Sequence, residues 1–224
     1  MVRRSRDIPQ REQNETRMRR AWSWLNLSEK SESDDEKFIF LWIAFNAVYG
    51  AELPDTSDDD RITERDRLAD FANKIVERDR ERAIENMLWD SFSGPVRVLL
   101  ENKFVFGPFW SWVQEREKPA DKDWESKFKE RKQRVLEALG RHDVSRVLEE
   151  VLARLYVLRN QIIHGGTTFA EGWGRDQLRD GRRIMETIMP LILQIMQDDI
   201  AKSPDSNVWG SLNYPRVGES ERPE

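Results

Sequence analysis

The chain has 224 residues, of which 38% are hydrophobic and 35% charged, and its formal net charge is −5 at pH 7. This length and hydrophobic content suffice for one folded domain with a substantial core, and they exclude an intrinsically disordered protein. The negative charge argues against a protein that coats nucleic acid by bulk electrostatics, although it is compatible with a small site that acts on RNA.

The absence of cysteine excludes disulfides, a thiol nucleophile and a cysteine metal site. The two histidines, His142 and His164, are too few for a zinc site, so we expect neither a metal nor another cofactor. The basic N-terminus is not followed by an apolar stretch of signal-peptide length, and no apolar run reaches the roughly 20 residues of a membrane helix. The sequence therefore predicts a cytoplasmic protein without membrane contact.

Helical periodicity dominates the chain, which predicts an all-α helical bundle. Residues 1–14 are expected to form a flexible basic arm, and residues 15–202 a helical domain with an inserted segment at about 103–140. Residues 203–224, rich in Pro and Gly, are expected to form a tail. Trp209 and Tyr214 are candidates for attaching part of this tail to the domain.

The first predicted helix contains residues 22–25, and a second follows the polar stretch 31–35. Ser33 and Glu36 have the spacing of a capping box ahead of the apolar run 38–49, which Gly50 is expected to end. Because this run is apolar on nearly every side, it should lie at the centre of the bundle. The acidic stretch 55–60 is expected to be a solvated loop that caps the next helix, around Leu68 and Ile75.

Gly94 and Pro95 should divide the helical stretch that follows. Residues 104–112 form an aromatic patch, for which packing of the inserted segment is favoured over a partner surface. The highly charged stretch 118–134 predicts an exposed helix. The last helix is expected at about 175–199.

A helix at about 143–164 is predicted as the second central element, because two adjacent apolar stripes leave few positions for water. Arg159, Asn160 and His164 interrupt its apolar surface, and buried polar groups are costly unless they are paired or functional. On an ideal helix Asn160 and His164 lie about 40° apart in line with Tyr156, whereas Arg159 and His164 lie about 140° apart. Arg159 must then reach round the helix, or meet His164 of a second subunit across a twofold interface.

The segment 159–164, Arg-Asn-Gln-Ile-Ile-His, resembles the signature of the HEPN family: an Arg, commonly followed by a polar residue, and then a His after four to six intervening residues. Gly165 after the His is similar to the family as well, and with Gly166 it is expected to end the helix and leave His164 near an opening. Residues 41–50, which include Asn46, look like the early central helix of HEPN-like proteins, among them abortive-infection relatives. The two segments cover a small share of the chain.

The resemblance implies a helical bundle of HEPN type that dimerises through the motif face and, in many members, cuts single-stranded RNA without a metal. RNA carries its own nucleophile, the 2′-hydroxyl, so a site needs only proton transfer and charge stabilisation. His164 would act as general base or acid, and Arg159 would hold the phosphate. Asn160 would orient His164 or bind a phosphate oxygen. These roles predict products that end in a 2′,3′-cyclic phosphate.

The leading hypothesis is thus an endoribonuclease of the toxin or antiviral-defence kind, with RNA as substrate and a homodimer as its active form. An antitoxin such as a nucleotidyltransferase is a candidate partner. The alternative is a non-catalytic HEPN-like module that binds a nucleotide or a protein, and a third reading is a structural protein in which Arg159 and His164 only pack. Asn46 and Tyr156 would support the motif, although a buried, hydrogen-bonded amide is the commoner role for Asn46.

Overall fold

The computed structural model describes residues 8–50, 63–114, 123–166, 168–169, 174–212 and 214, without the side chains of Phe92 and Ser93. Every regular secondary-structure element in these ranges is a helix, which confirms the predicted all-α bundle. The α-helices are α1 (Gln10–Lys30), α2 (Asp34–Tyr49), α3 (Glu64–Arg78), α4 (Ala83–Ser91), α5 (Arg97–Glu101), α6 (Gly107–Val113), α7 (Trp124–Gly140), α8 (Val144–Ile163) and α9 (Arg175–Lys202). A π-helical turn, η2 (Phe92–Val96), precedes α5, and a short 3₁₀ turn, η3 (Lys103–Val105), precedes α6.

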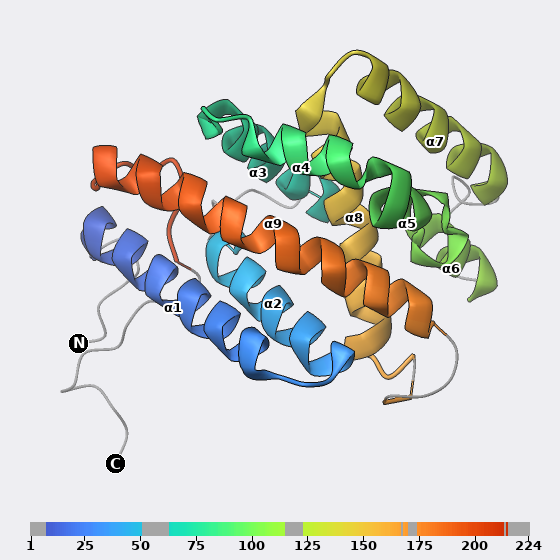
Figure 1. Ribbon diagram of the computed structural model, residues 1–224, viewed down its shortest axis with the longest axis horizontal. Helices are drawn as coiled ribbons and strands as arrows, with labels where there is room; N and C mark the ends of the chain where they lie inside the picture. Colours follow the sequence, from blue (N-terminus) through green and yellow to red (C-terminus); the bar gives the residue numbers. More distant parts are fainter. Residues whose placement is uncertain are drawn as a thin grey trace.

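Helices α1, α2 and α9 lie side by side, and α8 crosses behind α9 (Figure 1). Helix α3 packs on α8 from the far side, and α7 covers the outer side of α8 near its N-terminal end (Figure 1). The core lies between α2, α8 and α9, where one face of each helix is apolar. Gly181 of α9 makes this crossing close, because its backbone faces the Leu158 side chain of α8.

Helix α2 is central, as its apolar sequence predicts, but one strip of it remains open. The Ser33 hydroxyl caps its N-terminus by accepting a hydrogen bond from the Glu36 N–H at 3.1 Å. Phe38 and Phe45 are fully buried, whereas Asn46 is exposed. This open strip of α2 is therefore available to form the wall of a surface cleft.

Helix α3 begins with a capping box that involves different residues from those predicted. The Thr63 hydroxyl accepts a hydrogen bond from the Asp66 N–H, and the Asp66 carboxylate accepts one from the Thr63 N–H at 2.9 Å. The Thr63 hydroxyl also donates to the Asp66 carboxylate at 2.6 Å, and this bond, together with the one from the Thr63 N–H, holds the pKa of Asp66 below its ordinary value. The prediction that the acidic stretch 55–60 caps this helix is therefore wrong, and the stretch itself lies outside the described residues.

The segment from α4 to α7 follows its sequence signals in part. Gly94 interrupts the helical backbone between α4 and α5, as predicted. Helix α7 begins only at Trp124, where the Asp123 side chain caps it, and Val135 and Phe128 on its inner face contact the rest of the bundle. The predicted exposed helix thus starts later, and one of its faces packs against α8.

Both predicted chain ends are more ordered than the boundaries at 14 and 203 imply. Helix α1 begins at Gln10, inside the predicted arm, and Arg17 is fully buried. Its Nη2 donates a hydrogen bond to the Gly210 carbonyl at 2.7 Å, and Trp209 is 4% exposed. Residues 203–212, which we call the C-terminal segment, therefore pack on α1 as part of the domain, as the Trp209 prediction anticipated. Residues 1–7 of the predicted arm lie outside the described residues.

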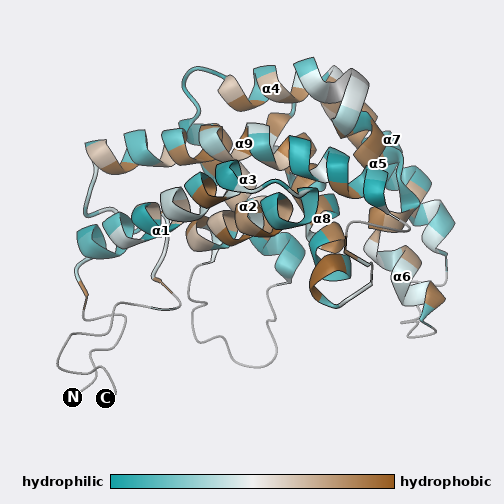
Figure 2. Cartoon of the chain, turned by 60° about the horizontal axis from the view of Figure 1, so that its bottom comes forward, coloured by the Kyte–Doolittle hydropathy of each residue, from teal (hydrophilic) through white to brown (hydrophobic). Residues whose placement is uncertain are grey.

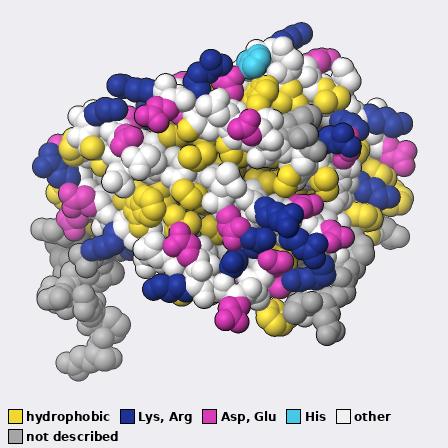
Figure 3. All heavy atoms as spheres, viewed as in Figure 1, with side chains coloured by type: hydrophobic (Ala, Val, Ile, Leu, Met, Phe, Trp, Pro, Cys, Tyr) yellow, Lys and Arg dark blue, Asp and Glu magenta, His cyan; other side chains and the backbone are white. Residues whose placement is uncertain are grey.

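Lys and Arg side chains gather over the N-terminal part of α9 on the face shown in Figure 3. Two of these arginines are paired with carboxylates at the start of α2. Arg175 Nη2 lies 2.6 Å from Asp35 Oδ2, and Arg182 Nε lies 2.7 Å from Asp34 Oδ1. These pairs join α9 to α2, so much of this positive charge is neutralised within the protein.

The distribution of hydropathy along the helices is amphipathic, with hydrophilic residues on the outer faces of α1, α5 and α7 (Figure 2). Within the described ranges, none of the helices combines the length and the apolar character needed to span a membrane.

We expect Gly181→Ala to lower the free energy of unfolding by about 1–2 kcal/mol, although alanine favours helices. The added Cβ would lie 2.4 Å from Leu158 Cδ2, in a core where Leu158 is only 2% exposed. Gly140→Ala is the matched control, because no atom lies within 4 Å of its Cβ position. Urea denaturation measures both; equal midpoints for the two variants would contradict the close α8–α9 contact.

Candidate functional site

A cleft of about 410 Å³ opens beside the last turns of α8. Its walls come from α1, α2, α3, α8 and the chain around residue 212, so segments from both ends of the sequence meet there. Helix α8 contributes Tyr156 and Arg159, and α2 contributes Asn46. These three predicted site residues therefore line one cavity, which we call the Arg159 cleft.

Arg159 is held by its neighbour in the sequence. Its Nη1 donates a hydrogen bond to Asn160 Oδ1 at 2.9 Å. Its Nε–H is buried without an acceptor, and among the described residues no carboxylate pairs with this guanidinium. A buried donor left without a partner costs on the order of 1–3 kcal/mol. An anion in the cleft would supply the charge that the protein does not.

Three arginines line the cleft. Arg20 of α1 and Arg67 of α3 line it together with Arg159, and Glu64 is the carboxylate among the described lining residues. Glu64 is already engaged, because Oε1 accepts a hydrogen bond from the Tyr49 hydroxyl at 2.6 Å and Oε2 accepts one from Arg67 at 3.3 Å. Arg20 Nη1 donates to the Tyr214 carbonyl at 2.6 Å, so Arg20 and Arg67 both have partners within the protein, and Arg159 is the arginine best placed to contact an anionic ligand.

Aromatic rings form much of the remaining wall. Burial and the neighbouring Glu64 carboxylate raise the pKa of Tyr49, so its hydroxyl stays protonated and donates to Glu64. The Tyr156 ring packs against Trp42, with ring centroids 6.1 Å apart, and Trp24 lines the cleft from α1. Rings beside guanidinium groups suit a ligand that combines flat unstacked bases with phosphates.

Asn46 differs from the buried structural amide that was the commoner expectation. Its side chain is exposed at the cleft, and its amide group makes no hydrogen bond to another described residue. The carbonyl of Asn46 accepts the Gly50 N–H at 2.8 Å, which ends α2. The amide is therefore free to contact a ligand beside Arg159.

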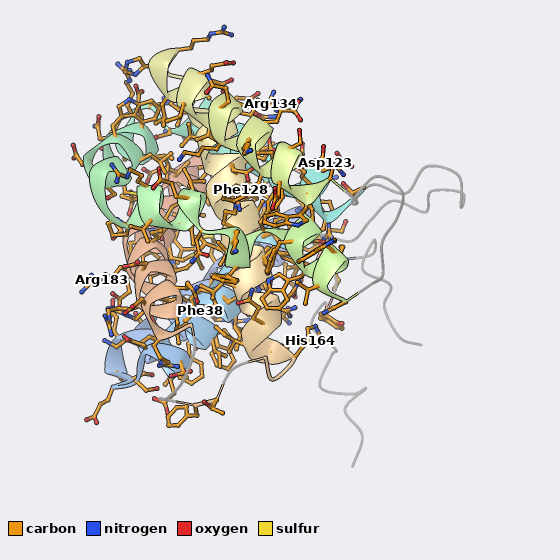
Figure 4. The ribbon with its side chains drawn as sticks, turned by 90° about the vertical axis from the view of Figure 1, so that its right-hand side faces the viewer. Phe38, Asp123, Phe128, Arg134, His164 and Arg183 are labelled. Atoms are coloured by element: carbon orange, nitrogen blue, oxygen red, sulfur yellow. The ribbon has the colours of Figure 1, made fainter. Side chains whose placement is uncertain are left out.

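His164 lies outside the cleft, at the C-terminal end of α8 (Figure 4). It is the C-cap residue, its N–H donates to the Asn160 carbonyl at 3.0 Å, and its side chain is exposed. Gly165, which follows with φ of +70°, ends the helix as predicted. Because five helical residues turn the chain through about 140°, a ring on residue 164 projects away from the guanidinium on residue 159. Within one copy the structure brings Arg159 and Asn160 together, and it leaves His164 on the adjoining surface.

Sequence reasoning missed Arg20, Arg67 and Glu64. Arg20 belongs to a basic cluster that reads as a solvated surface, and Arg67 and Glu64 lie in a helix start rich in charges. Nothing in their local spacing distinguishes them from surface charges. Only the packing of α1 and α3 around α2 and α8 brings them to the cleft.

We expect Arg159→Met to change the free energy of unfolding by less than about 1 kcal/mol, because the substitution removes no ion pair. Arg154→Met is the matched control on the same helix. Arg154 is 2% exposed and its Nε donates to Glu150 Oε1 at 2.9 Å, so its loss should cost at least about 2 kcal/mol. Chemical denaturation measures both. A large loss for Arg159→Met would identify Arg159 as a packing residue instead.

No group of three or more His, Cys, Asp or Glu residues in the described ranges could hold a metal ion. Comparison with family models, curated proteins and solved structures finds no match to the chain. The candidate site is therefore defined by its own residues: Arg159 in a positively charged, ring-lined cleft, with His164 exposed at the end of the same helix.

Proposed function

We propose that the chain is a metal-independent endoribonuclease of the toxin or defence kind, which cleaves single-stranded RNA. The observation that carries the proposal is the Arg159 guanidinium, which has no carboxylate partner among the described residues and lines an open cleft together with Arg20 and Arg67. A phosphate would complete its hydrogen bonds in a geometry that the planar guanidinium suits. The rings of Trp24 and Tyr156 would accept the adjoining bases.

In the proposed reaction the 2′-hydroxyl oxygen of the RNA attacks phosphorus, and the bond from phosphorus to the 5′ oxygen breaks. The products are a 2′,3′-cyclic phosphate and a free 5′-hydroxyl. Arg159 stabilises the charge on the non-bridging oxygens, while Asn160 fixes the guanidinium through the 2.9 Å hydrogen bond. His164 takes the proton from the 2′-hydroxyl or gives one to the leaving oxygen.

This reaction requires His164 of a second copy, because His164 does not line the cleft of its own chain. The surroundings of His164 suit a contact between copies. Ile163 is 49% exposed and Phe169 is 66% exposed, and an apolar cavity of about 80 Å³ beside Ile163 also reaches Arg159. In a twofold dimer formed over this face, each cleft would receive its histidine from the partner copy.

Mixing two inactive variants tests whether the site is shared. Arg159→Ala and His164→Ala are each expected to be inactive. Random exchange of subunits between them should restore about a quarter of the wild-type cleavage rate, because half of the dimers are mixed and each mixed dimer has one intact site. Measurement of the molecular mass in solution verifies that the mixed variants form dimers. If the two residues act within one copy, no mixed dimer has an intact site, and the absence of recovery would rule out the shared site.

The cleavage itself is tested with unstructured RNA in EDTA. Wild type should produce fragments that end in a 2′,3′-cyclic phosphate, and His164→Ala should lower the rate by about 10²- to 10⁴-fold. His142→Ala is the matched control. His142 is the other histidine of the chain, and its side chain pairs with Glu85, a residue distant from it in the sequence. Equal loss in both histidine variants, or activity that EDTA abolishes, would contradict the mechanism.

The second candidate is a binding module that holds nucleotide or RNA without cutting it. The specific observation in its favour is that His164 lies outside the Arg159 cleft. In this case wild type binds RNA, Arg159→Ala loses binding, and His164→Ala binds as wild type does, with no cleavage by any of the three proteins. The two experiments above therefore separate a binding module from a ribonuclease.

A further inference from the structure

A second cavity, of about 270 Å³, lies on the other side of Glu64 and Tyr156 from the Arg159 cleft, since these two residues line both. Its walls come from α3, α7, α8 and the segment that joins η3 to α6. The two cavities thus follow one another along α8. A ligand longer than one nucleotide could occupy both.

The second cavity has its own group of cations. Arg65, Arg131 and Arg154 line it, and all three converge on the carboxylate of Glu150, which is almost fully buried. The nitrogen-to-oxygen distances are 2.8 Å for Arg65, 3.4 Å for Arg131 and 2.9 Å for Arg154. Three guanidinium groups therefore share this one carboxylate, and Glu149 gives a further contact to Arg65 at 2.6 Å. Glu64, which is engaged by Tyr49 and Arg67, lines the cavity as well, so three carboxylates face these three cations and the wall carries no surplus of positive charge.

Arg131 is the cation of this group with capacity for a ligand. Its ion pair with Glu150 is the longest of the three, and its side chain is 28% exposed. Arg154, in contrast, is buried and held between the rings of Phe106 and Phe128, at 4.6 Å and 5.1 Å from their centroids. Phe128 points from α7 toward α8 (Figure 4). Arg65 is 35% exposed but is held by two carboxylates at 2.6 Å and 2.8 Å, so Arg131 is the most weakly held cation of the three.

The remaining wall is apolar. Phe106, Pro108 and Val157 add apolar surface to the lining, and the Phe106 ring lies against Arg154 and Arg131, whose guanidinium carbons are 4.6 Å and 6.0 Å from its centroid. A cavity lined by both guanidinium groups and apolar side chains suits a nucleotide, whose base is flat and whose phosphate is charged. An acidic peptide would use the charge but not the apolar wall.

We propose that the second cavity binds a neighbouring nucleotide of the single strand whose phosphate lies on Arg159, with Arg131 contacting the next phosphate along. The inference rests on the proposed function, because it extends the strand held at Arg159. Tyr156 lies between the two positions and lines both cavities. Arg154 and Arg159 are about 7.5 Å apart along the helix axis, so the step between the cavities is short.

The test measures the binding of fluorescent 2′-O-methyl oligonucleotides, which lack the nucleophile and cannot be cut by the proposed mechanism. An octanucleotide and a dinucleotide are compared in EDTA across a range of salt concentrations. Arg131→Ala should weaken the affinity for the octanucleotide by about tenfold and leave the affinity for the dinucleotide unchanged. It should also reduce the slope of log affinity against log salt by about 0.7, the value for one phosphate contact on a single strand.

Arg134→Ala is the matched control on the same helix. Arg134 lies on the side of α7 that faces away from α8 (Figure 4), and it pairs with Glu130. Its loss should change neither affinity nor salt slope. Arg131→Lys keeps the charge and should retain most of the binding, and thermal melting checks that each variant is folded. Glu150 keeps Arg65 and Arg154 in the Arg131→Ala variant, so the fold should persist.

The outcomes separate the inference from the function on which it rests. Equal affinities and salt slopes for Arg131→Ala and Arg134→Ala overturn the inference. If Arg159→Ala loses the binding of both oligonucleotides, that result still supports the proposed cleft. A loss caused by Arg131→Ala but not by Arg159→Ala supports a nucleotide site in the second cavity and overturns the role proposed for Arg159. Competition by an oligoglutamate as strong as that by unlabelled octanucleotide overturns the choice of nucleic acid as the ligand.

Discussion

The burial of α8 is the constraint on which the rest of the structure depends. Its apolar stripes are covered by α3 on one side and α9 on the other, and Gly181 allows α9 to lie directly against Leu158. With the helix fixed in rotation, the direction of each polar residue on it is fixed as well. Arg154 points into the interior toward Glu150, and Arg159 points into a cleft. The positions of these polar side chains therefore follow from the way in which α8 packs.

Three arginines with little or partial exposure show how differently the protein uses the same side chain. Arg17 donates to the Asn14 amide oxygen and the Gly210 carbonyl and attaches the C-terminal segment to α1, while its buried Nε has no acceptor among the described residues. Arg154 is neutralised by Glu150 and enclosed by two rings. Arg159 has only the Asn160 amide oxygen among the described residues. Arg159 lacks the carboxylate that Arg154 has and, unlike the fully buried Arg17, lines a cleft that a ligand can enter.

The sequence predicted the helices with strong patterns and missed what depends on distant contacts. The apolar periodicity of residues 143–164 and the Ser33 cap of α2 locate two central helices, and Gly165 ends α8 as its position indicates. The start of α1 was placed too late because its first turn is polar, and only contact with the C-terminal segment buries it. The charged residues that line the cleft with Arg159 could not be predicted. Charges on α1 and α3 have the same local sequence pattern whether they face solvent or a cavity.

Helix geometry links the proposed catalysis to the oligomeric state. Residues 159 and 164 lie about 140° apart around the axis of one rigid helix. Their side chains can therefore approach the same ligand atom only if one of them extends around the helix. The Asn160 hydrogen bond holds Arg159 on the cleft side, and Gly165 releases the chain immediately after His164. Under the proposed function a twofold partner would resolve the conflict without bending either side chain, because a second His164 would approach the cleft from outside. For this chain, an active monomer would thus require a change at the end of α8, whereas an active dimer would require only a contact over the apolar surface beside Ile163.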